Sequence, residues 1–210
     1  TMGTQSVTLE NGKLTKRAER RLIADARKGC EDAARQLVAF HQDRLHAFVW
    51  RVLRDSDEAD DACQEAFLRA FNSLDSFSTK YRFSTWLFTI GYRVCLNRIR
   101  QRKPMTGEVD FQLLKSNEPD AAQEIAESEE AGRLKEQIWD AVDGLTAPQR
   151  SAVMLFYREQ LSCEEIAHTM EIPVATVKSH LHRARLRLKD SLALLVKDWS
   201  EIQTLRDIAS

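Results

Sequence analysis

Residues 83–103 (FSTWLFTIGYRVCLNRIRQRK) bring two kinds of side chain together in one short stretch. The first half is aromatic and aliphatic, and the second half carries cations with no acidic residue among them. These cations are Arg93, Arg98, Arg100, Arg102 and Lys103. Aromatic rings stack on bases and cations hold phosphates, so this combination suits an unwound nucleic-acid strand. Aromatic residues at helical spacing are equally typical of a helix core, and both interpretations stay open for this segment alone.

A second nucleic-acid pattern covers residues 162–189 (SCEEIAHTMEIPVATVKSHLHRARLRLK). Ser162 and Glu165 form an S-x-x-E capping box, which predicts that a helix begins there. Pro173 interrupts this helix, because proline lacks a backbone N–H and disfavours a helical residue before it. A second helix follows, with an apolar inner stripe and cations on its outward side. This pattern is typical of a helix-turn-helix, whose second helix enters the DNA major groove. A basic solvated helix is the alternative.

Acidic residues crowd one expected helix start. They are Asp55, Asp57, Glu58, Asp60, Asp61 and Glu65. A solvated helix start explains them, because acids are favourable near the positive end of the helix dipole. However, one helix face opposite the expected core is polar except for a leucine. This face, called the acidic strip below, consists of Asp61, Gln64, Glu65 and Leu68. Such a surface could instead dock a basic helical partner.

Composition limits the class of protein. At 210 residues the chain can form one large or two small domains with buried cores. Its net charge of −1 means that any nucleic-acid binding must come from local patches. No apolar run approaches the roughly 20 residues that span a bilayer. Residues 1–16 are too polar for a signal peptide. We therefore expect a soluble cytoplasmic protein with no membrane insertion.

No pattern in the chain indicates catalysis. The cysteines lie far apart and lack the paired spacing of zinc ligands. They are Cys30, Cys63, Cys95 and Cys163. We interpret them as free thiols in a reducing compartment, with a redox-sensing disulfide as the alternative. There is also no glycine-rich phosphate loop and no nucleophile–base set, so we expect no enzyme, no metal and no cofactor.

The whole chain is predicted to be all-α. It has only seven glycines and four prolines, and no segment alternates polar and apolar residues as a half-buried strand does. Helices of the first domain are expected at residues 16–28, 31–53, 57–74 and 84–102. Thr146 and Gln149 form a T-x-x-Q capping box, which opens a helix of the second domain.

An acidic linker separates the two helical domains. Residues 105–130 contain eight acids against a single base, Lys115. Such a composition favours a linker over a packed core. The expected organisation is a helical domain, this linker, a second helical domain with the helix-turn-helix, and a tail. Their ranges are 16–104, 105–130, 131–196 and 197–210.

Four segments in this order resemble the bacterial extracytoplasmic-function (ECF) sigma factors. They are EADDACQEAFLRAF, FSTWLFTIGYRVCLNRIRQRK, the acidic linker and LTAPQRSAVMLFYREQLSCEEIAHTMEIPVATVKSHLHRARLRLK. The resemblance covers about residues 22–192. It implies an alternative sigma factor that binds core RNA polymerase and directs promoter-specific initiation, in a stress or envelope response and under the control of an anti-sigma factor. In that family region 2, here the first domain, binds core polymerase and melts the minus-ten element of promoter DNA. Region 4, here the second domain, reads the minus-thirty-five element.

The resemblance also assigns functions to individual residues. Core polymerase binding falls on the acidic strip, Asp61, Gln64, Glu65 and Leu68. Minus-ten recognition and melting fall on a loop and the following helix, at Phe77, Tyr81, Phe83, Trp86, Arg93, Asn97, Arg98 and Arg100. Minus-thirty-five binding falls on Arg150, Thr176, Lys178, Ser179, His182 and Arg183, with Arg150 at a position that contacts the DNA backbone.

Four of these positions depart from the family pattern. Arg93 and Asn97 stand where many members carry asparagine and aspartate, and Lys178 and His182 differ from the arginine and aromatic residue common there. The exact base preferences therefore stay open. A different class also remains, a stand-alone helix-turn-helix regulator whose first domain senses a signal or dimerises. That alternative leaves the aromatic–basic segment and the acidic strip without a role.

Overall fold

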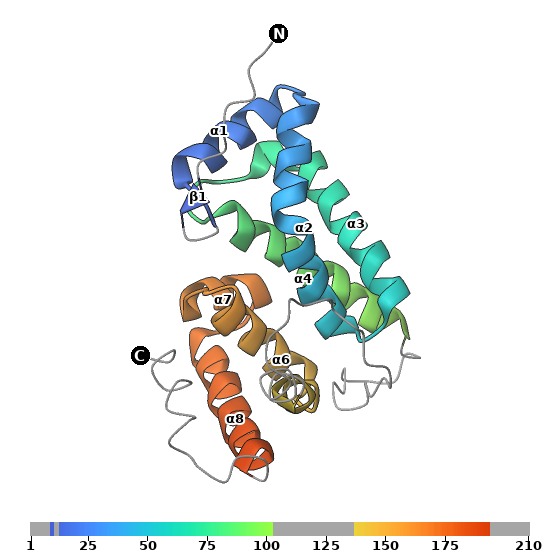
Figure 1. Ribbon diagram of the computed structural model, residues 1–210, viewed down its shortest axis with the longest axis vertical. Helices are drawn as coiled ribbons and strands as arrows, with labels where there is room; N and C mark the ends of the chain where they lie inside the picture. The colour runs from blue at the N-terminus through green and yellow to red at the C-terminus, as the bar shows by residue number, and fades with distance from the viewer. Residues whose placement is uncertain (1–8, 11–12, 103–136, 194–210) are drawn as a thin grey trace, which may run out of the picture.

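The computed structural model describes residues 9–10, 13–102 and 137–193, and these form two helical domains. The first domain contains four long helices (Figure 1). They are α1 (Lys16–Arg27), α2 (Glu31–Leu53), α3 (Ser56–Asn72) and α4 (Phe83–Arg102). A 3-10 turn, η1 (Leu74–Ser76), follows α3 and leads into the loop of residues 77–82. The helices expected from the sequence are confirmed.

Local signals fix where these helices begin and end. Thr15 caps α1, since its hydroxyl accepts a hydrogen bond from the Ala18 N–H at 3.2 Å. Asp55 caps α3 in the same way, accepting from the Glu58 N–H at 2.9 Å. Gly29 follows α1 with a φ of +84°, a left-handed conformation that glycine adopts without steric cost.

The core of the first domain lies where α2, α3 and α4 meet. Small alanines on α3 allow close packing against the large apolar residues of α2 and α4. Phe48 of α2 and Phe88 of α4 meet edge to face, with ring centroids 5.2 Å apart. Gly91 lies where α4 crosses α2, and a Cβ added there would be 2.8 Å from Leu45 Cδ1. The absence of a side chain at Gly91 therefore sets the distance between the two helices.

A short hairpin was not expected from the sequence. Strands β1 (Leu9–Glu10) and β2 (Lys13–Leu14) pair antiparallel, with Leu9 opposite Leu14. Each strand has two residues, too few for an alternating pattern to be visible. Leu14 is buried against the helical core, and Arg82 donates to its carbonyl oxygen at 2.5 Å. The all-α class is confirmed, with this hairpin as a minor addition.

The second domain is built around the helix-turn-helix. Residues 137–143 are helical, and the elements after them are α6 (Ala147–Val153), the π-helical turn η2 (Met154–Arg158), α7 (Cys163–Met170) and α8 (Val174–Ala193). Both predicted capping boxes are present, at the starts of α6 and α7. Between α7 and α8, Glu171 takes a left-handed conformation with a φ of 57°. Val177, Leu181 and Ala184 of α8 are buried, as the predicted inner stripe requires.

The two domains pack directly against each other. Helix α7 lies along α4, and α6 contacts α2 (Figure 1). We call this the closed arrangement. The predicted acidic linker (residues 105–130) and tail (residues 197–210) lie outside the described residues.

Candidate nucleic-acid and polymerase interfaces

The acidic strip lies on the solvent side of α3. Asp61 and Gln64 are exposed, Glu65 is half-buried, and Leu68 is 65% exposed. The opposite face of the helix carries buried alanines, including Ala62. Spacings of three and four residues place the strip on one face, as expected from the sequence. Among the described residues, Leu68 and Leu186 are the two large apolar side chains that remain exposed.

Arginines at the end of α4 are bound to the acids of α3. An Arg98 nitrogen lies 3.0 Å from Glu65 Oε2, and another lies 4.0 Å from Asp61. Arg102 donates from Nε to Glu58 Oε1 at 2.8 Å, and from a second nitrogen to a backbone carbonyl of α2 at 3.1 Å. The Arg98 guanidinium ties α4 to the acidic strip and is half-buried, so less of it is accessible than its position in a basic segment suggests. Its contact with minus-ten DNA stays a prediction. Arg93 and Arg100, seven residues apart, lie on another side of α4 and are exposed.

The structure separates the aromatic residues of the predicted minus-ten site into two groups. Phe77 and Phe83 are 7% and 0% exposed, and with the half-buried Trp86 they form a cluster with ring centroids 5.3–5.8 Å apart. Their faces are occupied by one another, which corrects the expectation that Phe77 and Phe83 offer stacking surfaces. Tyr81 is accessible at the loop, and its ring stacks on that of His168 at 4.7 Å.

Helix α1 holds this loop in place from both ends. Arg27 donates to the carbonyl oxygens of Leu74 and Phe77 at 2.8–3.1 Å. The buried Glu19 carboxylate accepts from the Phe83 N–H at 2.8 Å and pairs with Arg82 at 2.5 Å. Sequence reasoning missed this function of α1, because its charged residues give no pattern that distinguishes them from a solvated face.

Helix α8 presents the predicted DNA-reading residues on one side. Lys178, His182 and Arg183 are exposed, and Thr176 and Ser179 are half-buried. Lys178 and His182 are four residues apart, as are Ser179 and Arg183. Thr176 is three residues before Ser179, so the set forms two adjacent rows on one side of α8. The closed arrangement leaves this face accessible, since its lysine, histidine and arginine side chains are exposed while the two domains are in contact.

Arg150 lies in the interior of the second domain instead of on its DNA side. It is 1% exposed and donates to the carbonyl oxygens of Asp143 and Leu145 at 2.7 and 3.4 Å. Burial lowers the pKa of Arg150 to about 10, so the side chain still carries its charge at neutral pH. This corrects the expected contact with DNA, because the guanidinium stabilises the turn before α6 and is not accessible.

Polar contacts join the two domains along α4 and α7. The Thr85 hydroxyl donates to Glu165 Oε1 at 3.2 Å, and the Thr89 and Thr169 hydroxyls are 3.4 Å apart. Further along, Arg93 donates from Nε to an oxygen of Glu171 at 2.8 Å.

A second set of contacts joins α2 to the other domain. Arg51 reaches Asp143 at 2.5 Å, and its guanidinium lies between the rings of Trp50 and Trp139. Arg44 pairs with the buried Glu159. Buried apolar residues of the two domains also form one continuous cluster, so the interface combines apolar and polar contacts. Interfaces between domains of one chain that are partly polar are typical of domains that can move relative to each other.

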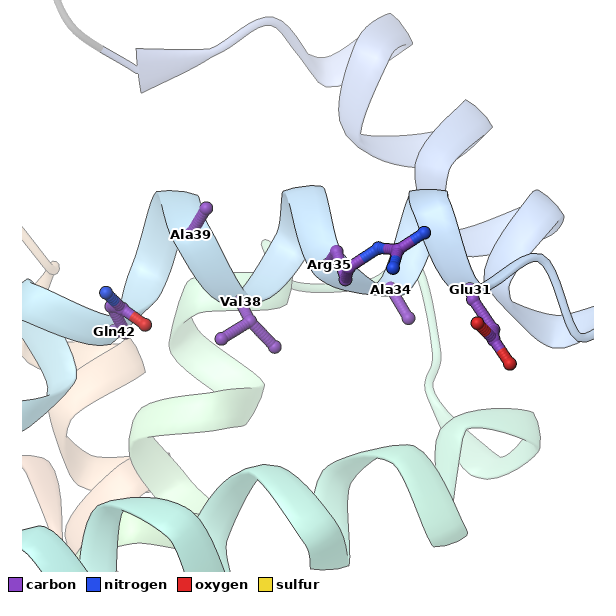
Figure 2. Close-up of a pocket in the computed structure, with 6 residues that line it drawn as sticks. All are labelled: Glu31, Ala34, Arg35, Val38, Ala39 and Gln42. Carbon is purple, nitrogen blue, oxygen red and sulfur yellow. The ribbon is translucent and has the colours of Figure 1, made fainter.

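The described residues show no arrangement typical of an active site or a metal site. A hollow along α2 is lined by six residues of that one helix, including Ala34 and Val38 (Figure 2). No second element converges on it, so it lacks the arrangement of an active site. Within the described ranges there is no cluster of metal-ligating side chains and no helix long and apolar enough to cross a membrane. The four cysteines are free thiols, and Cys63 and Cys95 are buried.

Comparison with known proteins identifies both domains. Residues 37–104 match sigma-70 region 2, and residues 135–188 match sigma-70 region 4. The chain therefore has the two-region organisation of a sigma-70-type transcription initiation factor.

Individual relatives show which group of sigma-70-type factors the chain belongs to. The ECF RNA polymerase sigma factor SigW of Bacillus subtilis is 31% identical, over 81% of this chain and 94% of that protein. The RNA polymerase sigma-H factor of Pseudomonas aeruginosa is also 31% identical, over 88% of this chain and 99% of its own length. The chain belongs to the ECF sigma factors. It is an alternative sigma factor, which binds core RNA polymerase and directs promoter-specific transcription initiation. The stand-alone regulator is thereby excluded.

Two solved structures resemble the whole fold. One is CnrH in complex with the cytosolic domain of CnrY, with a TM-score of 0.59 and 25% identity over 84% of this chain and 97% of that one. The other is the sigma factor RpoE in complex with the anti-sigma factor NepR from Bartonella quintana, with a TM-score of 0.61 and 25% identity over 78% of this chain and 98% of that one.

Proposed function

We propose that residues 16–104 hold core polymerase and the melted minus-ten element, and that residues 131–196 read the minus-thirty-five element. One observation carries this assignment. The acidic strip of α3, the outer face of α4 and the outer face of α8 are three separate polar surfaces, each accessible at least in part. A sigma factor needs three such surfaces, one for the polymerase and two for DNA.

Core polymerase binds the acidic strip in this proposal. Leu68 supplies an apolar contact at its centre, and Asp61 and Gln64 supply polar contacts at its rim. Interfaces of this kind gain most of their affinity from the desolvated centre, and the rim charges mainly steer association. Glu65 has a second function, because it also fixes Arg98 of α4.

The melted minus-ten strand binds the loop and the exposed face of α4. Tyr81 stacks on an unpaired base, Arg93 and Arg100 hold phosphates, and Asn97 reads a base edge. Trp86, Phe77 and Phe83 support the loop from inside the domain. Unstacking a base costs a few kcal/mol, which the contacts to the flipped base offset.

The minus-thirty-five element binds the outer face of α8. Lys178 and Arg183 donate to guanine edges in the major groove, and each good bidentate contact contributes roughly 1–3 kcal/mol of discrimination. Ser179, Thr176 and His182 complete this surface. Arg150 acts indirectly, by holding the turn that precedes α6.

The solved relatives support control by an anti-sigma factor. RpoE is bound to the anti-sigma factor NepR, and CnrH is bound to the cytosolic domain of CnrY. In this proposal the chain is held inactive in the cytoplasm until a stress or envelope signal releases it. We assign it no catalytic activity and no cofactor of its own.

The decisive experiment is run-off transcription of genomic DNA fragments with core polymerase from the same organism. Discrete transcripts that depend on this chain are expected. In parallel, Leu68→Asp should abolish co-purification with core polymerase, because it places a charge at the centre of the interface. The loss expected for a central contact is at least about thirtyfold in affinity.

A matched control is available in Leu186→Asp, the other exposed leucine. Both substitutions should change the free energy of unfolding by less than about 0.5 kcal/mol, as is usual for exposed positions. Core binding by the Leu68 variant at the level of the wild type would remove the acidic strip from the interface.

A further inference from the structure

A pocket lies where α1 and the loop of residues 77–82 meet the start of α4. One side of this pocket comes from the loop and includes Tyr81 and Arg82, and the other comes from α1 and includes Lys16 and Arg20. Family resemblance assigned a function to the loop side alone. The α1 side therefore has no assigned role in DNA binding.

The α1 side of this pocket has two positive charges without an acidic partner among the described residues. Glu19 lines it, but its carboxylate is already satisfied by Arg82 and by the Phe83 N–H. Lys16 and Arg20 are both exposed, and neither forms an ion pair within the described part of the chain. These two residues are four positions apart, so both side chains leave the same face of α1. The pocket therefore has a cationic wall opposite an aromatic residue.

An acid from the other domain also lines this pocket in the closed arrangement. Glu165 of α7 is the single residue of the second domain among those that line the pocket. It enters beside Thr85, whose hydroxyl donates to it at 3.2 Å. Its other oxygen accepts from the Ser162 N–H at 2.9 Å, so the carboxylate is held by α4 and by its own helix cap. Separation of the domains would remove this acid from the pocket and leave Lys16 and Arg20 as the unpaired charges of its α1 side, within the structure as described.

We propose that Lys16 and Arg20 bind backbone phosphates of the melted promoter strand whose base stacks on Tyr81. Helix α1 then forms the second wall of the minus-ten site and contributes affinity without reading sequence. The proposal rests on the proposed function of the loop. Glu165 lines the pocket in the closed arrangement, and the DNA strand enters it in the polymerase complex, when the domains have separated.

The salt dependence of single-strand binding tests this directly. Holoenzyme is assembled from the full chain and core polymerase, and the probe is a single-stranded oligonucleotide with the minus-ten sequence obtained from run-off transcription. For Lys16→Ala/Arg20→Ala, the slope of log affinity against log salt should become shallower by roughly 0.7 for each phosphate that is no longer neutralised. Permanganate-reactive thymines at the promoter should decrease in parallel, while core binding stays unchanged.

Two further variants separate phosphate binding from net charge and from folding. Arg17→Ala/Arg21→Ala removes the same charge from the same helix, but neither residue lines the pocket. It should keep the wild-type slope. Lys16→Arg/Arg20→Lys keeps both cations and should also keep that slope.

Equal slopes for the Lys16/Arg20 and Arg17/Arg21 double variants would overturn the proposal. That result leaves the proposed function intact if Tyr81→Ala still reduces promoter opening. If the wild-type chain itself directs no transcripts, the proposed function fails first.

Discussion

At the residue scale, His41 shows how one buried side chain couples stability to pH. It is 3% exposed, with the rings of Phe40 and Phe83 at centroid distances of 5.1 and 5.3 Å. Within the described structure, neither ring nitrogen has a hydrogen-bond partner. Burial, with the positive charges of Arg44 and Arg82, lowers the pKa of His41 to about 3. The folded protein therefore keeps this imidazole neutral.

His41 should make the protein less stable as the pH falls. An unfolded histidine has a pKa of about 6.5, so below that pH the unfolded chain binds a proton that the folded chain does not. Its contribution is complete above about pH 6.5 and is lost progressively toward pH 3. Between pH 7 and pH 5, the wild type should lose about 2 kcal/mol more unfolding free energy than His41→Leu. Urea denaturation at both pH values measures this difference, and parallel losses would contradict it.

Tyr81 and Phe83 lie two residues apart, but their alanine variants should differ: one should lose promoter opening and the other stability. Tyr81→Ala should leave core binding and closed-complex formation intact and reduce promoter opening, because a stacked base contributes roughly 1–3 kcal/mol. A pre-melted template should restore opening. Phe83→Ala should instead destabilise the protein by about 3–5 kcal/mol, since the ring is fully buried. Permanganate footprinting and urea denaturation distinguish the two outcomes, and normal opening by the Tyr81 variant would remove this residue from the melting site.

At the element scale, α4 has a polar face and a face that packs on α2. One carries Thr85, Thr89, Arg93, Asn97 and Arg100, whose spacings place them on one side of the helix. Helix α7 covers the first half of this face and leaves the second half exposed. The other face packs on α2 through Gly91. Contact with α2 therefore determines how α4 presents its polar face.

Gly91→Ala should destabilise the protein although alanine favours helices. The gain in helix propensity is about 1 kcal/mol. Against it, the new methyl group would lie 2.8 Å from the Cδ1 atom of the fully buried Leu45, and overpacking costs about 1–3 kcal/mol. We expect a net loss of about 1 kcal/mol in urea denaturation. Leu45→Val should recover part of this loss in the double variant, and a more stable Gly91→Ala protein would contradict the tight crossing.

At the scale of the whole molecule, the proposed binding of one promoter element by each domain is incompatible with the closed arrangement. Their names place them roughly 25 base pairs apart, which is roughly 85 Å along the duplex at 3.4 Å per base pair. In the closed arrangement α4 and α7 are in direct contact. The domains must therefore separate in the polymerase complex. In the closed arrangement, Tyr81 stacks on His168 of α7, and Arg93 pairs with Glu171 in the turn after α7.

Weakening these contacts should expose the minus-ten face without polymerase. His168→Ala/Glu171→Asn removes the stacked ring and the carboxylate, and asparagine tolerates the left-handed backbone at position 171. The isolated variant should bind single-stranded DNA more tightly than the wild type, measured by fluorescence anisotropy. Glu164→Gln is the control, because it removes a charge from an exposed position of the same helix. An equal increase for both proteins would indicate a general charge effect instead of domain opening.

The sequence by itself determined the helices, the two domains and the family. Each of these rests on signals between near neighbours. The capping residues Thr15, Asp55 and Ser162 act three residues along the chain, and the apolar stripes repeat every turn. The acidic strip and the outer face of α8 were also predictable, since exposure follows from lying opposite an apolar stripe. Two strands of two residues each carry no such signal, and the hairpin was missed.

Tertiary structure decided which of the predicted site residues are free to act. Arg98 is bound by Glu65, 33 residues away, and Phe83 is held by Glu19, 64 residues away. Arg93 meets Glu171 across the two domains, 78 residues away. Two side chains of opposite charge attract each other when they are close in space, even if they are far apart in the sequence, because electrostatic and packing energies depend on distance in space. Sequence patterns reach only along one helix, so the pairing of these side chains, and with it the accessible DNA surface, followed from the folded structure.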